Sequence, residues 1–201
     1  MLQLWKVLET KITYQDPWIR LRSDRCLTSR GAMIEAYHIL EFHGWINVIG
    51  LTPTGEIVLV REYRHGAGKI VPGLPSGSMH RSETNPEETA RRELQEETGF
   101  VGGDYFALGN IYANPGIQNN RIWTYLAIGV EQGGTRSLDP TEDIEVWTEP
   151  FAPYLRKTLE DPTELQAPHL AALHLTMGFI LRTKDERLLK LRAEILKELA
   201  S

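Results

Sequence analysis

Two hydrophobic patterns divide this chain, and one gives way to the other near Pro150. Before that point, short apolar runs alternate with turn residues such as Gly, Pro and Asn, which is typical of strands joined by turns. Beyond it, apolar residues recur with a helical period, which predicts helices. The expected strands cover residues 5–14, 18–27, 32–42, 45–51, 57–64, 107–113, 122–130 and 144–148, and the expected helices cover residues 151–159, 164–181 and 184–199.

The first three expected strands lie within residues 1–43 and suit a small antiparallel sheet. A three-stranded sheet of this size is marginally stable alone, so we expect it to pack on the rest of the chain or on a second subunit. Residues 45–51 and 57–64 are apolar for most of their length and flank a turn sequence, which predicts a hairpin buried on both faces.

One helix is predicted among the strands, between residues 85 and 99. Asn85 is a favourable N-cap, and Pro86 suits the first helical position. Glu88 lies three residues after the cap, as in a capping box, and Gly99 supplies a natural end. The local signals therefore define both ends of this helix.

Three glutamates share one patch of the predicted helix. At 3.6 residues per turn, Glu93 lies one turn before Glu97, with Glu96 beside them, while Ala90 and Leu94 form an apolar stripe toward the core. Like charges at this spacing repel, so a hard divalent cation bound through oxygen ligands would convert the patch into a site. The alternative is a solvated acidic face whose ion-pair partners are Arg91 and Arg92.

Composition narrows the class of protein. The 201 residues are 41% hydrophobic and carry a net charge of −5, which argues against nucleic acid as a partner. Cys26 is the single cysteine, so no intrachain disulfide forms, and we interpret it as a core residue. His169 and His174 are five residues apart and do not share a helix face, so we interpret them as packing or surface residues. Without an apolar run long enough for a membrane span or a signal-peptide pattern, a cytoplasmic location is expected.

The stretch from Gly77 to Phe100 resembles the Nudix box, G-x(5)-E-x(7)-R-E-U-x-E-E-x-G-U, in which U is aliphatic or aromatic. The matching positions are Gly77, Glu83, Arg92, Glu93, Leu94, Glu96, Glu97, Gly99 and Phe100. One departure is an extra residue, since eight rather than seven residues separate Glu83 from Arg92.

The chain is similar to the ADP-ribose pyrophosphatase branch of Nudix hydrolases over most of its length. Residues 60–64 resemble that branch's V-R-x-Y-R segment, and residues 73–77 resemble E-L-P-A-G, with Gly73 in place of the glutamate. The resemblance implies an α/β fold, a Nudix α/β/α sandwich with a mixed sheet. It also implies an N-terminal strand region, residues 1–43, for dimerisation and the substrate pocket, and a Nudix hydrolase domain with C-terminal helices, residues 44–201.

The resemblance also implies roles for particular residues. Magnesium or manganese would be bound by Glu93, Glu96, Glu97 and the Ser76 carbonyl, with Arg92 orienting the carboxylates. Pro115 occupies the place of a proline associated with the branch and is a substrate-binding candidate.

Two further sets of candidate residues are assigned from their positions in the chain. Arg61 and Arg64 end a buried strand, where they would hold substrate phosphates or form a solvated edge. For the general base, the acidic stretch before residue 144 offers Glu142 first and Asp143 second, the alternative being a surface acidic loop.

Together with the acidic cluster, the resemblance implies a metal-dependent hydrolase that cuts the diphosphate bond of a nucleoside diphosphate sugar, ADP-ribose first, to a nucleoside monophosphate and a sugar phosphate. The expected protein is a homodimer acting on this small molecule, without nucleic acid or membrane. The alternative is a Nudix-like module that senses a nucleotide sugar without turning it over.

Overall fold

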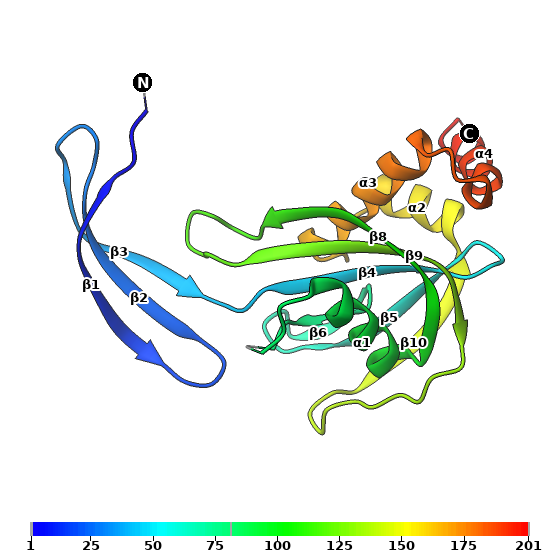
Figure 1. Ribbon diagram of the computed structural model, residues 1–201, viewed down its shortest axis with the longest axis horizontal. Coiled ribbons are helices and arrows are strands. Elements are labelled where there is room, and N and C mark those ends of the chain that lie inside the picture. Colours follow the sequence, from blue (N-terminus) through cyan, green and yellow to red (C-terminus); the bar gives the residue numbers. More distant parts are fainter. Residues whose placement is uncertain (1, 81, 201) are drawn as a thin grey trace. The chain divides into compact units, whose positions relative to one another are not determined.

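The computed structural model describes residues 2–80 and 82–200, and the chain divides into two compact units. One unit contains the chain up to Gly44 together with Ile111–Arg121. The other contains Trp45–Asn110 and the chain from Ile122 onward. Figure 1 shows the strands and helices of each unit.

The first unit is built on an antiparallel sheet of three strands, β1 (Lys6–Gln15), β2 (Arg20–Leu27) and β3 (Met33–Glu41). The three strands and their antiparallel arrangement are as predicted. The segment Ile111–Arg121 joins this unit from far along the chain, because the Leu40 amide donates to the Ile117 carbonyl at 2.7 Å.

The second unit is organised by a seven-stranded sheet. Its main path runs β10-β5-β4-β9-β8, with β6 paired to β5 and β7 paired to β4. Strands β4 and β9 are parallel, whereas β5 is antiparallel to β4, β6 and β10, so the sheet is mixed, as predicted. The strands are β4 (Trp45–Leu51), β5 (Glu56–Arg64), β6 (Lys69–Gly73), β7 (Ser76–Ser78), β8 (Phe100–Tyr112), β9 (Arg121–Gln132) and β10 (Ile144–Pro150).

Period-two alternation sends the strand side chains into two separate cores. Val48 and Val58 pack with Leu94 of α1 (Pro86–Thr98) on one face. Ile49 and Leu59 pack on the other face, against α2, α3 and α4. Helices on both faces of one sheet make the predicted α/β/α sandwich, visible in Figure 1 as the green α1 on one side and the yellow to red helices on the other.

The first C-terminal helix begins at the predicted residue, whereas the next two begin later than the hydrophobic period alone predicts. The C-terminal elements are α2 (Phe151–Glu160), α3 (Ala167–Arg182), the 3₁₀ turn η1 (Glu186–Leu188) and α4 (Leu189–Leu199). The residues before α3 form a turn closed by the Leu165 amide and the Pro162 carbonyl, and Pro168 occupies the first helical turn. Among the described residues, no helix is both long and apolar enough to cross a membrane.

Strands β6 and β7 were not predicted, and β8 begins at Phe100, directly after α1, rather than at residue 107. Both new strands are short and contain Gly, Pro or Ser, residues with low intrinsic strand preference. They form because β6 pairs with β5 and β7 pairs with β4. This pairing places the β7 backbone beside α1.

Candidate active site

Helix α1 has the capped ends that the sequence predicts. The Asn85 side chain accepts a hydrogen bond from the Glu87 amide at 3.1 Å, which satisfies one of the orphan donors of the first turn. Gly99 ends the helix with a φ of 75°, in the left-handed region that glycine tolerates best, and its amide donates to the Gln95 carbonyl. The cap residues therefore set the register of the glutamates between them.

Two glutamates of α1 are buried against strand β7. Glu93 is 8% exposed and Glu97 is 5% exposed. The Ser76 amide donates to Oε2 of Glu97 at 3.1 Å. A Cβ added to Gly77 would lie 2.2–2.3 Å from the carboxylate atoms of Glu93, so only glycine lets the strand approach this closely. Gly77 and Ser76 thus form the wall against which both carboxylates lie.

Burial changes the acidity of both groups. Desolvation raises the pKa of Glu93 to about 7, although the neighbouring Arg92 acts in the opposite direction. Desolvation, followed by the charge of Glu93, raises the pKa of Glu97 well above its usual value. The pair therefore needs a positive charge to remain fully ionised near neutral pH.

Arg92 links the acidic residues at the surface edge of this cluster. Its guanidinium contacts Glu83 Oε1 at 2.9 Å, Glu93 Oε1 at 2.9 Å and Glu96 Oε2 at 2.8 Å. The extra residue between Glu83 and Arg92 is accommodated before the helix, so the Glu83 contact still forms. Arg92 thus links Glu83, which precedes α1, to two carboxylates of the helix.

Strand alternation separates the two arginines that the sequence pairs. Val60, Glu62 and Arg64 alternate on the same face of β5 as Val58, which packs toward α1. Arg64 pairs with Glu62, and its Nε is buried without a hydrogen-bond partner among the described residues. A donor of this kind can serve a phosphate oxygen.

Arg61 projects from the opposite face of the same strand. It pairs with Glu145 of β10, and its guanidinium lies 5.9 Å from the ring centre of Trp147. Trp147 packs against the core beneath α2 and α3, on the side of the sheet away from α1. The fold therefore does not bring Arg61 to the acidic cluster.

Glu62 belongs near the cluster, and the sequence analysis missed it. Burial raises the pKa of Glu62, partly offset by Arg64, and the charge of Glu62 in turn raises the pKa of Glu97. The sequence feature that could have identified Glu62 is its position two residues after Val60, because strand alternation then puts it on the α1 face.

Glu142 lies in the loop between β9 and β10, within electrostatic range of the buried acids. Its charge contributes to the raised pKa values of Glu62, Glu93 and Glu97. The Asp139 amide donates to its Oε2 at 3.0 Å. Both Glu142 and the neighbouring Asp143 are exposed.

Pro115 belongs to the other unit. It lies exposed in the turn between β8 and β9, within Ile111–Arg121. The residues that the second unit brings together are therefore Ser76, Arg92, Glu93, Glu96 and Glu97, with Arg64 and Glu142 directed to the same side.

The donor set at this cluster suits a hard divalent cation. Glu93 and Glu97 supply buried carboxylate oxygens, and the Ser76 backbone lies beside Glu97. In the conformation seen here, no three His, Cys, Asp or Glu side chains of residues 2–80 and 82–200 are grouped to hold an ion. In this conformation the positive charge that pairs with Glu93 and Glu96 is the guanidinium of Arg92.

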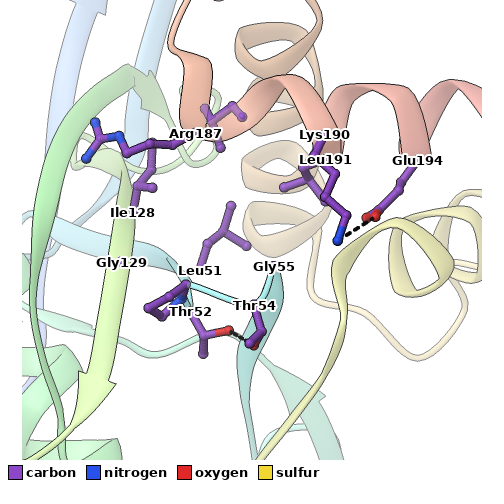
Figure 2. A pocket seen from close by; sticks show the side chains of 12 residues that line it. Leu51, Thr52, Thr54, Gly55, Ile128, Gly129, Arg187, Lys190, Leu191 and Glu194 are labelled. Carbon is purple, nitrogen blue, oxygen red and sulfur yellow. Dashed lines mark hydrogen bonds and ion pairs between the residues drawn. The ribbon is translucent and has the colours of Figure 1, made fainter.

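A cavity of about 570 Å³ lies elsewhere in the same unit, between the β4–β5 turn and α4 (Figure 2). Arg187 in its wall pairs with Asp104 and Asp185, and Lys190 lies 3.7 Å from Glu194. These side chains are neutralised by their own neighbours. None of the predicted site residues lines this cavity, so the cluster on α1 is the candidate active site.

Comparison with known families identifies both parts of the chain. Residues 42–166 match the sequence model of the NUDIX domain. Residues 5–40 match that of the nucleoside diphosphate sugar hydrolase N-terminal domain.

Individual relatives agree with this result. An ADP-ribose pyrophosphatase of Bacillus subtilis is 30% identical over 63% of this chain and 64% of its own length, so the chain covers slightly less than two thirds of that relative. One from Mycobacterium tuberculosis is 28% identical over 79% of this chain and 78% of its own. A solved structure described as an ADP compounds hydrolase has a TM-score of 0.78, with 22% identity over 90% of this chain and 96% of that one, which shows the fold.

Proposed function

Because the chain belongs to the Nudix family, we propose that it hydrolyses the diphosphate bond of a nucleoside diphosphate sugar, with ADP-ribose as the first candidate. The products are a nucleoside monophosphate and a sugar phosphate. The observation that carries the proposal is the pair of buried carboxylates, Glu93 and Glu97, held one helical turn apart against the β7 backbone.

The choice of substrate is supported by the relatives. Two of them are named as ADP-ribose pyrophosphatases, and residues 5–40 match a domain described from nucleoside diphosphate sugar hydrolases. A substrate with two linked phosphates also suits a site that combines an acidic cation cluster with an arginine on the same side of the sheet.

Magnesium or manganese is the proposed cofactor. Glu93, Glu96, Glu97 and the Ser76 carbonyl are the residues that would hold it, since oxygen ligands are those that magnesium prefers. When bound, the ion neutralises phosphate oxygens and lowers the pKa of a water molecule. Its charge would also favour the ionised forms of Glu93 and Glu97, whose pKa values burial raises.

The side chains of the protein supply binding and proton transfer. Arg64 binds a substrate phosphate through donors on the α1 side of the sheet. Arg92 holds Glu93 and Glu96 in position through its ion pairs. Glu142 accepts the proton of the attacking water, because its carboxylate is exposed and close enough for its charge to act on Glu93 and Glu97.

A substrate panel tests this function. Purified protein is incubated with nucleoside diphosphate sugars and dinucleotides, with magnesium and separately with manganese, and products are separated by chromatography. We expect AMP and ribose 5-phosphate from ADP-ribose, and no release when the cation is chelated. Tight binding of a nucleotide sugar in calorimetry with no turnover of any panel member would instead identify a sensor.

A homodimer is also part of the proposal, with residues 1–43 as the region that serves dimerisation. This region leaves large apolar side chains in solvent, including Trp5, which is 48% exposed and precedes β1, and Trp18, which is 83% exposed and lies between β1 and β2. Exposed apolar surface of this kind marks an interaction site.

A further inference from the structure

The loop from Gly133 to Asp143 is attached to the last turn of α1 by hydrogen bonds that the proposed reaction does not itself require. The Ser137 amide donates to the Glu96 carbonyl at 3.0 Å, and Nε of Arg136 donates to the Glu97 carbonyl at 2.8 Å. The Gly134 amide donates to the Gly99 carbonyl at 2.9 Å. The loop that carries Glu142 is therefore fastened to the residues that carry the proposed cation ligands.

Arg136 also reaches the far end of this loop. Its Nη2 donates to the Ile144 carbonyl at 2.6 Å, at the first residue of β10. One guanidinium thus spans two backbone carbonyls, one on α1 and one just after Glu142. A rigid, forked donor can hold two acceptors at a fixed separation, which a single ammonium group cannot do.

The carbonyl end of α1 favours a positively charged donor such as Arg136. Its final carbonyls have no partner within the helix, and the negative end of the helix dipole favours a cation there. The last turn itself contains no basic side chain. Arg136 supplies from the loop the positive charge that the helix sequence lacks.

We propose that Arg136 is a positioning residue, which fixes the loop so that Glu142 lies over the acidic cluster of α1. This role rests on the proposed function. In the part of the chain that the structure describes, the hydrogen bonds of the Arg136 side chain go to the backbone carbonyls of Glu97 and Ile144, so it acts on the reaction through the place of the Glu142 carboxylate.

A positioning role and a purely structural role of Arg136 differ in their expected effects on kcat and KM. Loss of Arg136 should lower kcat by about 10- to 100-fold while KM stays within about threefold, because Arg64 and the cation ligands remain in place. Arg136→Lys should recover part of the loss, since it keeps the positive charge and a donor for one of the two carbonyls but lacks the fork that spans both. Hydrogen exchange at the Ser137 amide should accelerate in Arg136→Gln.

Coupling to Glu142 is the deciding measurement. If Arg136 acts through Glu142, the Arg136→Gln substitution should change kcat by less than about twofold in a Glu142→Gln background. Arg156→Gln is the matched control, because Arg156 also ties two elements together, donating to Glu198 at 2.8 Å between α2 and α4. The control should keep wild-type kcat.

Several outcomes would overturn the role. Wild-type kcat in Arg136→Gln, or full additivity with Glu142→Gln, removes the positioning role while leaving the proposed function intact. A wild-type protein without turnover of any panel member removes the proposed function, and this role with it. An accelerated Ser137 amide together with unchanged kcat shows a tie that the reaction does not need, which also overturns the proposal.

Discussion

Glu93, Glu96 and Glu97 lie on one patch of α1, but their burial differs. Glu93 and Glu97 are buried, whereas the Glu96 side chain is 39% exposed and pairs with Arg92. A carboxylate that water can reach is screened, while a buried one depends on local charge. Glu97 is therefore the residue of the three that best reports a bound cation.

The first prediction concerns Glu97→Gln. A neutral amide cannot replace a carboxylate that binds a cation, so turnover should fall by orders of magnitude while the fold is kept. Magnesium should raise the Tm of the wild-type protein more than that of the variant, because the cation binds the folded state. Calorimetric scans with and without magnesium, together with the product assay, measure both effects.

Glu87→Gln is the matched control for this substitution. Glu87 lies in the first turn of the same helix and pairs with Arg91 at the surface. It should keep both turnover and the magnesium effect on Tm. Unchanged turnover in purified Glu97→Gln would rule out the α1 cluster as the catalytic site.

Gly73 and His169 form a second close pair in this unit. The His169 ring is 1% exposed, and its Nδ1 accepts a hydrogen bond from the Leu74 amide at 3.3 Å. Burial, followed by the charge of Arg64, lowers the pKa of His169 to about 3, so the ring is neutral at neutral pH. The interpretation of His169 as a packing residue is consistent with this burial.

The second prediction is that Gly73→Ala destabilises the protein. The added Cβ would lie 2.7 Å from two atoms of the His169 ring, and such overpacking costs about 1–3 kcal/mol. The double variant Gly73→Ala with His169→Ala should be more stable than the sum of the two single effects, because the clash is removed. Urea denaturation gives the free energies of unfolding.

Gly66→Ala provides the control, since nothing lies within 4 Å of a Cβ added there. Its free energy of unfolding should match that of the wild type within about 0.5 kcal/mol. Equal stability of Gly73→Ala and wild type would contradict the close packing of the ring on Gly73.

At the scale of elements, the sheet decides which side chains can act together. Strand β5 sends Glu62 and Arg64 toward α1 and Arg61 toward the opposite core. The β9–β10 loop adds Glu142 from a third segment, while Glu145, inside β10, pairs with Arg61. The position of each element therefore favours Glu142 over Glu145 as the general base.

The third prediction tests this choice of base. Glu142→Gln should lower kcat by about 10²- to 10⁴-fold with saturating magnesium, because a positioned base contributes that much. The loss should be greatest at low pH, where hydroxide is scarce. Rates measured between pH 6 and 9 on the best substrate provide the comparison.

Asp143→Asn and Glu145→Gln are the companion variants and should keep near-normal turnover. If one of them loses activity while Glu142→Gln does not, the loop is correct and the residue is wrong. Normal rates in all three variants would place the base outside residues 142–145.

At the scale of the whole molecule, the N-terminal region of residues 1–43 exposes several large apolar side chains. Trp18 is 83% exposed, and Trp5 and Tyr14 are also exposed. A monomer would leave these rings in water, which is unfavourable. A second copy of the chain is the proposed cover.

The fourth prediction is a homodimer at micromolar concentration. Light scattering should give about twice the chain mass of 22.9 kDa. Trp18→Ser should shift the equilibrium toward monomer, because it removes apolar surface from the proposed interface. Leu196→Ser, at a 53% exposed position on α4, is the control and should leave the mass unchanged. A wild-type mass near 23 kDa would contradict the dimer.

The sequence alone determined the features that depend on neighbours in the chain. Asn85 and Gly99 defined the ends of α1, and the helical period then placed Glu93 and Glu97 one turn apart. Apolar runs located strands such as β4, whose predicted and observed bounds coincide. These features are set by backbone geometry and by interactions over a few residues, so a linear pattern contains them.

Only the tertiary structure decided which distant groups meet. His169 reaches Leu74 across 95 positions, and Arg136 reaches Glu97 across 39. The burial of Glu97 depends on β7, a strand too short and too rich in small residues to be recognised from its own sequence. These contacts arise because hydrophobic burial and sheet pairing bring distant chain segments together. A local sequence pattern does not identify which distant residue a side chain will contact.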